Sequence, residues 1–510
     1  MKKTDVTFIS PGNTSRIYQD LAKKYTTIEP PTWSLLLAQA VRSDHSCNII
    51  DINAENICDE EVYNRLVVDN TQIAVFVVYD QNVNAGTVSM SGAVKTANKL
   101  RELGWTKPIA FIGSHVQALP KKTLEEESSI DFVFTNEGVY ALKNLLSKGK
   151  YDDATLADTK GIAWRGPECV VINAAEAVVP NDRMDIDLPG YAWDLLPMRE
   201  KPLDLYRAPM WHAEYNENIR SPYAAIQTSL GCQFGCGFCM INMINRNDEA
   251  EIGVASNYSK MRHWSPEFII KEFDKLVDMG VTTIKITDEL FLLNKKYYKP
   301  LCEALAARPY ADKLTMWAYS RVDTVRDPEV LKLLRSSGIK WLALGIESAE
   351  RTVRLEVSKG RFEDVDINKV VRQVEDAGIH VMANYIFGLP GDTHESMRKT
   401  LDFSKELNTI GWNAYGAMAL PGSDLYRDAV MQGQDLPDSY EGYSFFGYNT
   451  VPASNGILSS AEILKFRDEA WREYHSNPEF LERVRECFGD QQVKNIQDML
   501  EVKLKRRILE

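Results

Sequence analysis

Three cysteines on one short loop are the residues of this chain whose type and spacing point most directly to chemistry. Cys232, Cys236 and Cys239 stand in a CxxxCxxC pattern inside the run GCQFGCGFC. Thiolates at this spacing can converge on a single inorganic cluster, because the residues between them let the chain wrap around it. A 4Fe-4S cube has four irons and the loop supplies three thiolates, so one iron is left open for a small-molecule ligand.

Two other uses of clustered cysteines fit this loop less well. A structural zinc site takes four protein ligands, commonly in pairs such as CxxC, and His212 and His263 are isolated. A disulfide framework is typical of secreted chains, and an odd group of three cysteines without a signal peptide does not indicate one. The spacing therefore favours the open cluster, with zinc as the alternative.

The loop resembles the CxxxCxΦC signature of radical S-adenosylmethionine (SAM) enzymes, with Phe238 as the aromatic residue before the last cysteine. The resemblance implies that the three cysteines hold a 4Fe-4S cluster, that the amino and carboxylate groups of SAM chelate its open iron, and that Phe238 packs beside the adenine. Electron transfer from the cluster would then break the S–C5′ bond of SAM and give a 5′-deoxyadenosyl radical that abstracts hydrogen.

Length and composition indicate a multidomain protein of the reducing cytoplasm. At 510 residues the chain is too long for one ordinary core. A formal net charge of −13 argues against a general nucleic-acid binder, which would show a basic surface. No apolar run approaches the roughly 18 to 20 residues needed to cross a bilayer, and the polar start is no signal peptide.

We expect an α/β layer at 1–150, a connector at 151–220, a barrel at 221–424 and a helical domain at 425–510.

The first layer alternates short β-rich apolar runs with helix-like segments. Such alternation favours a doubly wound parallel sheet of the Rossmann-like kind, which binds ligands in crevices at the carboxyl ends of its strands. No GxGxxG follows any of these strands, so a nicotinamide dinucleotide is not expected. The expected strands lie at 6–10, 48–52, 73–79, 109–113 and 131–135, and a β-hairpin is expected in the connector at 161–173.

This run resembles the cobalamin-binding domain that precedes many radical SAM enzymes, through the Glu-Pro-Pro run at 29–31, the run GSHVQALP at 113–120 and the Asn-Glu-Gly turn at 136–138. The DxHxxG sequence of mutase domains is missing from the chain, so the resemblance implies a cobalamin whose lower face lacks a His ligand. A plain α/β layer with polar turns is the alternative. The candidate cobalamin-binding residues all lie in loops that leave the strands: Pro11, Tyr79, Asp80, Asn82, Gly113, Ser114, His115, Asn136, Glu137 and Gly138.

From residue 223 the pattern becomes strand, loop, helix, repeated through six strands. Six units fit an open, partial TIM-like barrel better than a closed eightfold one, and the active sites of such barrels lie at the carboxyl ends of the strands. The unusual residues of this sequence cluster at those ends. The expected strands lie at 224–228, 282–287, 314–319, 341–346, 381–387 and 413–419.

SAM needs an acceptor for its ammonium, a donor for its carboxylate and an acceptor for its ribose hydroxyls. Asp288 and Glu289 follow the second strand, where the resemblance places the group that holds the amine, and the sequence leaves open which is used. Ser320 and Arg321 follow the third strand, and Arg321 is the candidate for the carboxylate. Glu347 follows the fourth strand and suits the ribose. The alternative for Arg321 and Glu347 is an ion pair on the rim.

In residues 425 to 510 strands and helices no longer alternate, and this segment is expected to form a helical cap. A capping box, Ser459 to Glu462, opens a helix to about residue 474, and further helices are expected at 480–487 and 491–507.

The combined resemblance implies a cobalamin-dependent radical SAM carbon methyltransferase. One SAM would methylate cobalamin, a second would yield the radical, and the substrate radical would capture the methyl from methylcobalamin. A small-molecule or peptide substrate and a flavodoxin- or ferredoxin-type reductant would complete the reaction. Two alternatives stay open: an enzyme with the same cofactors that catalyses a non-methylating rearrangement or oxidative cyclisation, and a non-catalytic iron-sulfur sensor.

Overall fold

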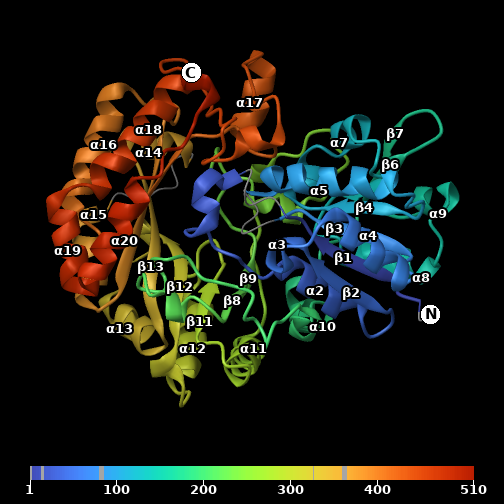
Figure 1. Ribbon diagram of the computed structural model, residues 1–510, viewed down its shortest axis with the longest axis horizontal. Helices are drawn as coiled ribbons and strands as arrows, with labels where there is room; N and C mark the ends of the chain where they lie inside the picture. Colours follow the sequence, from blue (N-terminus) through green and yellow to red (C-terminus); the bar gives the residue numbers. More distant parts are fainter. Residues whose placement is uncertain (1–2, 13–16, 80–84, 326, 359–364) are drawn as a thin grey trace.

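The computed structural model describes residues 3–12, 17–79, 85–325, 327–358 and 365–510. Figure 1 shows two α/β halves side by side, the amino-terminal one in blue to cyan and the second in green to red. Each half is built on its own sheet, with helices packed on its faces. The predicted class, a doubly wound sheet followed by a partial barrel and a helical end, is confirmed.

The amino-terminal sheet has seven strands in the order β2-β1-β3-β4-β5-β6-β7. The first five strands are parallel, and the predicted hairpin adds β6 and β7 in antiparallel register beside β5. The layer therefore continues past the expected boundary at residue 150. The strands are β1 (Val6–Ser10), β2 (Cys47–Asp51), β3 (Ile73–Val77), β4 (Ile109–Ile112), β5 (Phe132–Phe134), β6 (Ile162–Arg165) and β7 (Val170–Ile172).

Helices cover both faces of this sheet, which is why its central strands are apolar on both sides. Val75 on β3 belongs to the same buried cluster as Leu36, whereas its neighbour Phe76 lies with Met90 in the cluster on the opposite face. The helices of this half are α2 (Thr32–Val41), α3 (Ile52–Glu55), α4 (Asp59–Val68), α5 (Gly86–Glu102), α6 (Ser114–Ala118), α7 (Pro120–Glu126), α8 (Val139–Lys148) and α9 (Asp153–Ala157).

The second sheet is an open, parallel half-barrel in the order β15-β14-β13-β12-β11-β8, as the six strand-helix units predicted. Its strands are β8 (Tyr223–Ile226), β11 (Thr283–Ile286), β12 (Thr315–Arg321), β13 (Ile339–Glu347), β14 (His380–Phe387) and β15 (Gly411–Gly416). A short ribbon, β9 (Ser229–Leu230) with β10 (Arg262–His263), flanks the cysteine loop. The connecting helices are α11 (Pro266–Asp278), α12 (Lys295–Ala306), α13 (Pro328–Ser336), α14 (Arg351–Val357), α15 (Ile367–Asp376) and α16 (His394–Leu407).

Of the carboxyl-terminal helices, α18 (Ser460–His475) packs on β15 at the edge of the half-barrel, and α19 (Pro478–Phe488) and α20 (Asp490–Leu500) pack with α18. The helix α17 (Asp424–Gln432) lies apart from them (Figure 1). The Arg467 guanidinium on α18 donates a 2.8 Å hydrogen bond to the Ala414 carbonyl of β15, so a backbone acceptor on this edge is satisfied by a side chain. The helix predicted at 491–507 ends earlier, at Leu500. Beyond it Arg506 donates a hydrogen bond to the Asp468 carboxylate, with 2.8 Å between Nε and a carboxylate oxygen.

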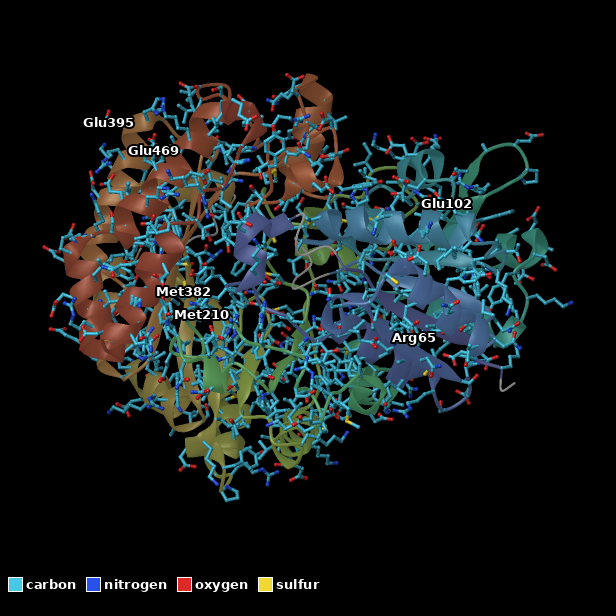
Figure 2. All side chains as sticks on the ribbon, in the orientation of Figure 1. Arg65, Glu102, Met210, Met382, Glu395 and Glu469 are labelled. Carbon is cyan, nitrogen blue, oxygen red and sulfur yellow. The ribbon has the colours of Figure 1, made fainter. Side chains whose placement is uncertain are left out.

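No helix in the described part of the chain is long and apolar enough to cross a membrane. Charged side chains such as Glu102, Glu395 and Glu469 lie at the periphery of the molecule (Figure 2).

Candidate active site

The residues singled out in the sequence gather at one rim of the half-barrel. Asp288 and Glu289 follow β11, Arg321 ends β12 and Glu347 ends β13, while the cysteine loop follows β9. All of these positions lie at the carboxyl ends of neighbouring parallel strands, the edge where such folds build their active sites.

The cysteine loop is held by its backbone and by one asparagine. Asn242 accepts a 2.8 Å hydrogen bond from the Cys232 amide and donates a 3.1 Å bond to the Phe234 carbonyl. Gly231 enters the loop at a φ of 77°, and a Cβ there would lie 2.2 Å from the Lys260 carbonyl. Only glycine fits this position, and the clamped backbone fixes the directions of the thiols.

The three thiols sit in a poorly solvated environment. Burial raises the pKa of Cys232 to about 12 and that of Cys236 to about 11, against the lowering effect of the Arg321 guanidinium. Burial also raises the pKa of Cys239, and the neighbouring thiols and Glu289 add to the effect. Thiols in such a place become thiolates when a metal supplies the missing positive charge.

Three thiolates on one loop suit an open cluster better than a structural zinc ion, which takes four protein ligands. Among the described residues no group of three or more His, Cys, Asp or Glu side chains is arranged to hold one metal ion. A single zinc needs all its sulfurs about 2.3 Å from one centre. A cube ligated at three separate irons takes sulfurs that are farther apart, and the chemistry of the three thiols suits it.

The two carboxylates after β11 differ in their surroundings. Asp288 is buried and accepts hydrogen bonds from the Thr228 amide (2.6 Å), the Thr228 hydroxyl (2.5 Å) and the Ser229 hydroxyl (2.7 Å). Glu289 is half-buried and makes no hydrogen bond or ion pair with any described residue. Burial raises the pKa of Glu289 to about 7. Asp288 thus ties strand ends together, and Glu289 is available to a ligand.

Glu347 is the second half-buried carboxylate without a hydrogen bond or ion pair to any residue that the structure describes. It lies at a φ of 65°, where the register between β13 and β14 shifts after Gly345. A glutamate in this left-handed region stores strain, which is found most often at functional sites. Burial raises the pKa of Glu347 to about 7, although Arg321 is close enough to oppose the shift.

Arg321 is held in a fixed orientation by two neighbours. Its guanidinium makes a bidentate, buried ion pair with Asp323 and lies 4.1 Å from the centroid of the Phe234 ring. The ion pair given as the alternative role of Arg321 thus forms, with Asp323 as the partner. A cavity of 530 Å³ opens beside Arg321, Asp323 and Phe234. Ser320 points elsewhere, with its hydroxyl 2.6 Å from that of Thr324.

Phe238 lies on the far side of the loop, in a small apolar cluster with Val353, Val357, Leu389 and Ala417. The turn after β14 that carries Leu389 is rigid, because Asp392 accepts 3.1 Å hydrogen bonds from the Gly388 and Leu389 amides. An aromatic ring held against aliphatic side chains offers a surface on which a planar group can pack.

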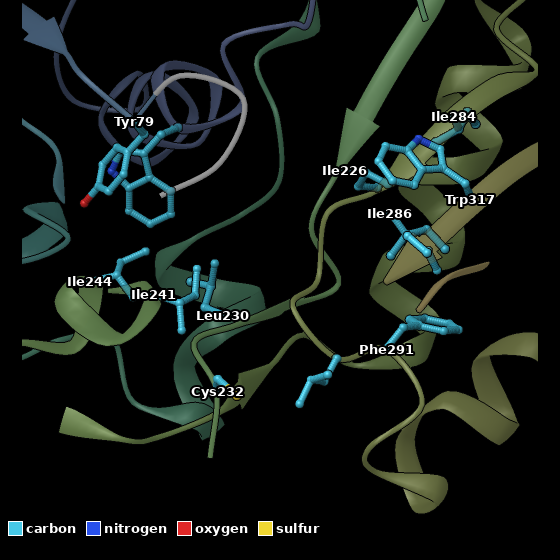
Figure 3. Close-up of a cluster of buried hydrophobic side chains, with 14 of the residues drawn as sticks. Tyr79, Ile226, Leu230, Cys232, Ile241, Ile244, Ile284, Ile286, Phe291 and Trp317 are labelled. Atoms are coloured by element: carbon cyan, nitrogen blue, oxygen red, sulfur yellow. The ribbon is translucent and has the colours of Figure 1, made fainter. Parts of the chain in front are cut away.

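The loops of the amino-terminal sheet approach this site from the other half of the molecule. Tyr79 lies in the same buried cluster as Ile241 and Ile244, which follow the cysteine loop, and Figure 3 shows these two isoleucines between Tyr79 and Cys232. The Tyr79 hydroxyl accepts a hydrogen bond from Gln117, and the Tyr79 ring meets the Trp33 ring edge-on at 5.4 Å.

Three polar residues predicted to bind cobalamin have polar partners within the protein. His115 is buried with Nδ1 3.1 Å from the Thr87 hydroxyl, and burial lowers its pKa to about 3. Asn136 donates to the Glu176 carbonyl at 2.7 Å. Glu137 lies 2.7 Å from the guanidinium of Arg262, and both side chains are buried.

The remaining candidates are backbone positions or lie outside the description. Gly138 begins α8 at a φ of 78°, Ser114 is buried at the start of α6, and Pro11 is half-buried. A Cβ on Gly113 would lie 2.3 Å from the Val78 carbonyl, so the close approach of two strand ends requires glycine there. Asp80 and Asn82 lie outside the described residues.

Sequence reasoning missed four residues that build the site: Asn242, Asp323, Gln117 and Arg262. Asp323 stands two positions after Arg321, and this Arg-x-Asp spacing was a usable signal for the pair. The other three act on partners far away in the sequence, and their spacing carries no such signal.

Comparison with known proteins agrees with this geometry. Residues 226–404 match the family model of the Radical SAM superfamily. This part of the chain is a radical SAM domain. The match runs from the end of β8 into α16, so the radical SAM domain includes the cysteine loop and the ends of β11, β12, β13 and β14.

Three similar proteins extend the comparison beyond the radical SAM domain. The uncharacterized methyltransferase PH0819 of Pyrococcus horikoshii is 26% identical over 487 residues, with 94% of each chain covered. An anaerobic magnesium-protoporphyrin IX monomethyl ester cyclase of Cereibacter sphaeroides is 24% identical, covering 83% of this chain and 63% of the cyclase. The structure of the radical SAM methyltransferase TsrM from Kitasatospora setae, with cobalamin and a 4Fe-4S cluster bound, superposes with a TM-score of 0.65 at 15% identity, covering 93% and 90% of the two chains. That likeness shows a shared fold across both halves.

Proposed function

We propose that this protein is a cobalamin-dependent radical SAM methyltransferase that moves a methyl group from SAM, through cobalamin, to an unactivated carbon. The observation that carries the proposal is the juxtaposition of three thiols with two half-buried carboxylates, Glu289 and Glu347, that have no protein partner among the described residues. Buried polar groups are normally paired, so unpaired carboxylates beside such thiols indicate a ligand.

In this proposal Cys232, Cys236 and Cys239 hold the 4Fe-4S cluster. The loop that carries them has little freedom to adjust, because Asn242 and the backbone near Gly231 fix it. Burial limits the contact of the thiols with water, since Cys232 is buried and Cys236 and Cys239 are half-buried. A dry, rigid site suits chemistry in which reactive species must be shielded from solvent.

SAM would be held by the residues of the rim. Glu289 accepts the ammonium and Glu347 the ribose hydroxyls, because both carboxylates have free oxygens there. Arg321, oriented by Asp323, donates to the carboxylate, and Phe238 packs beside the adenine. Asp288 and Ser320 support the site through their internal hydrogen bonds and do not contact SAM.

Cobalamin would lie between the carboxyl ends of the first sheet and the radical SAM domain. Tyr79 would border it, as would the loops at Pro11, at 113–115 and at 136–138. The structure of TsrM, whose fold matches across both halves, was solved with cobalamin bound. His115, Asn136 and Glu137 are occupied by protein partners, so we assign them to the walls of this crevice.

When bound, the cofactors would supply a carbon radical that removes hydrogen from the substrate and a methyl group that replaces it. The protein contributes orientation and exclusion of water. No acid or base is needed for this step, and the raised pKa values of Glu289 and Glu347 are consistent with groups that bind a cation and hydroxyls.

A second candidate function is an oxidative cyclisation with the same cofactors. It is favoured by the similarity to the magnesium-protoporphyrin IX monomethyl ester cyclase, which is 24% identical over 440 residues. A non-catalytic iron-sulfur sensor is disfavoured, because it leaves the unpaired carboxylates without a role.

The proposed reaction needs a substrate and a source of electrons. The substrate is a small molecule or a peptide, and a flavodoxin- or ferredoxin-type protein supplies electrons. The net charge of −13 does not favour nucleic acid as a partner. The location we propose is the reducing cytoplasm, where cysteines are kept from forming disulfides.

Methyl-labelled SAM separates the two candidate functions. The protein is purified without oxygen, loaded with iron, sulfide and cobalamin, reduced, and incubated with SAM that carries a deuterated methyl group. The methyltransferase proposal expects S-adenosylhomocysteine to form and the label to leave SAM for the cobalamin fraction. Formation of 5′-deoxyadenosine with no S-adenosylhomocysteine would instead favour the cyclisation.

A further inference from the structure

The half-barrel encloses a second cavity of 430 Å³, below the rim that carries the candidate cofactor residues. Eleven of its 30 lining residues are aromatic, whereas aromatic residues make up 10% of the chain. Its walls come mainly from four parts of the sequence: the segment 18–29, the connector residues 209–215, strands of the half-barrel between β11 and β15, and the carboxyl-terminal segment 445–504. Figure 2 shows two of its lining side chains, Met210 and Met382, inside the barrel half.

Strand β12 links this cavity to the rim. Side chains of a strand alternate between its two faces, so Trp317, Tyr319 and Arg321 share one face. Trp317 and Tyr319 line the cavity, and Arg321 stands at the rim. A molecule held between the aromatic rings therefore lies next to the position proposed for SAM.

The aromatic rings form flat surfaces at several angles. Trp211 meets Trp317 edge-on at 4.6 Å, and Phe445 lies 4.4 Å from Tyr415. Phe446 stacks on Tyr18 at 5.5 Å, which joins the carboxyl-terminal wall to the amino-terminal segment. Rings arranged in this way can pack against both faces and the edge of another planar ring.

The charged side chains that line the cavity have polar partners within the protein. Lys285 lies 2.8 Å from Glu29, and Arg467 lies 2.9 Å from Asp468. Arg472 has no ion-pair partner among the described residues, and its guanidinium instead donates to the Leu500 and Val502 carbonyls at 2.8 and 2.9 Å. A cationic ligand would find no unpaired carboxylate here, and an anionic ligand would have to displace these backbone contacts of Arg472. Burying an unpaired charge costs several kcal/mol.

Neutral polar groups are available instead. The Tyr319 hydroxyl and the Asn413 carbonyl oxygen make no hydrogen bond to any residue in the described part of the chain, and both residues line the cavity. Such groups fix the orientation of an uncharged ligand that carries one or two hydrogen-bonding atoms.

We propose that this cavity binds the methyl-accepting substrate and that the substrate is a neutral, planar aromatic small molecule with uncharged polar substituents. The proposal rests on the proposed function and deepens it by naming the substrate class. Of the two substrate kinds considered above, it selects the small molecule over the peptide, because the cavity is walled by four parts of the sequence.

Calorimetric titration of the anaerobically purified full-length protein tests the inference with three probes. 2-Naphthol is neutral and planar, 2-naphthoate carries a charge on the same ring, and 1-octanol is apolar without a ring. We expect 2-naphthol to bind at least about tenfold more tightly than either other probe, because charge is excluded and ring packing is lost.

A matched pair of variants places the binding site. Phe445→Leu removes a ring from the cavity wall, and Phe403→Leu makes the same change on α16, outside the cavity. The first variant is expected to weaken 2-naphthol binding about three- to tenfold and the second to leave it unchanged. Equal binding of 2-naphthoate or 1-octanol, or equal effects of the two variants, would overturn the inference.

A parallel assay of SAM cleavage keeps the two proposals apart. SAM cleaved to 5′-deoxyadenosine by a protein that does not bind 2-naphthol would overturn the cavity inference alone. Binding of 2-naphthol by a loaded, reduced protein that leaves SAM intact would overturn the proposed function, and with it the role of the cavity as a substrate site.

Discussion

The carboxylate of Glu137 lies 2.7 Å from the guanidinium of Arg262, and this buried ion pair joins the two halves of the molecule. Glu137 follows the last parallel strand of the first sheet, and Arg262 belongs to the ribbon beside the cysteine loop. The guanidinium also donates to the Val179 carbonyl and the Asn245 side chain, at 2.8 and 2.9 Å. The pair therefore sets the distance between the proposed cobalamin crevice and the proposed cluster.

Removal of one partner of this pair is expected to destabilise the protein strongly. Glu137→Ala leaves the Arg262 charge buried without its counter-ion, which typically costs about 3–5 kcal/mol. The shift of the urea unfolding midpoint measures the loss. The control Glu102→Ala, on the exposed end of α5, should stay within about 0.5 kcal/mol of wild type. Equal midpoints for the two variants would contradict the structural role of the pair.

Neutralising the two adjacent carboxylates after β11 is expected to change different properties, SAM binding in one case and stability in the other. Glu289→Gln should weaken SAM binding by about tenfold or more and should not lower thermal stability, because this side chain has no protein partner to lose. Asp288→Asn should lower stability by about 1–3 kcal/mol, because the new amide group faces the Thr228 and Ser229 donors.

Calorimetry with SAM on the cluster-loaded protein and thermal melts of the unloaded protein measure the two effects separately. A loss of SAM binding in Asp288→Asn at full stability, with Glu289→Gln unaffected, would reverse the assignment of the ammonium site.

Gly231 can be tested against a glycine with the same backbone conformation and open surroundings. Gly231 has a φ of 77° and a Cβ there would lie 2.2 Å from a carbonyl oxygen, whereas Gly280 has a φ of 83° and no atom within 4 Å. Gly280→Ala should cost about 1 kcal/mol from backbone strain alone. Gly231→Ala should also displace the loop and reduce the iron bound after reconstitution, as measured by metal analysis.

The stability of the cofactor-free protein is expected to depend on pH through Glu347. Its folded pKa is raised to about 7 by burial, whereas a glutamate in an unfolded chain titrates near about 4.3. The folded state thus binds the proton more tightly, so stability is lost as the pH rises from about 5 through 7. Glu347→Gln cannot ionise and should be more stable than wild type at pH 8 but not at pH 5, as compared by urea unfolding. A difference that does not change with pH would contradict the buried environment of this carboxylate.

The positions of the strands and of the rim could be predicted because local signals fix them. Apolar runs bounded by caps define the strands and helices, and parallel strands must bring their carboxyl ends to one edge. The cysteine spacing and the carboxylates after β11 therefore fell on the same rim without any knowledge of contacts.

The partners of those residues could not be predicted in the same way. Asp288 and Glu289 are adjacent acidic residues, and the sequence does not say which of them binds the SAM ammonium. The hydrogen bonds from Thr228 to Asp288 distinguish the two carboxylates. The Glu137–Arg262 ion pair depends on packing between segments that are distant in the sequence. The same is true of the pairing of the hairpin with β5. The helix expected to reach residue 507 stops at Leu500.

Cleavage of SAM by the reduced, iron-loaded protein tests the central claim most directly. We predict that wild type forms 5′-deoxyadenosine, that Cys236→Ala forms none, and that Glu289→Gln forms it only at SAM concentrations about tenfold higher or more. Undiminished 5′-deoxyadenosine from Cys236→Ala, or none from wild type with a fully assembled cluster, would contradict the account.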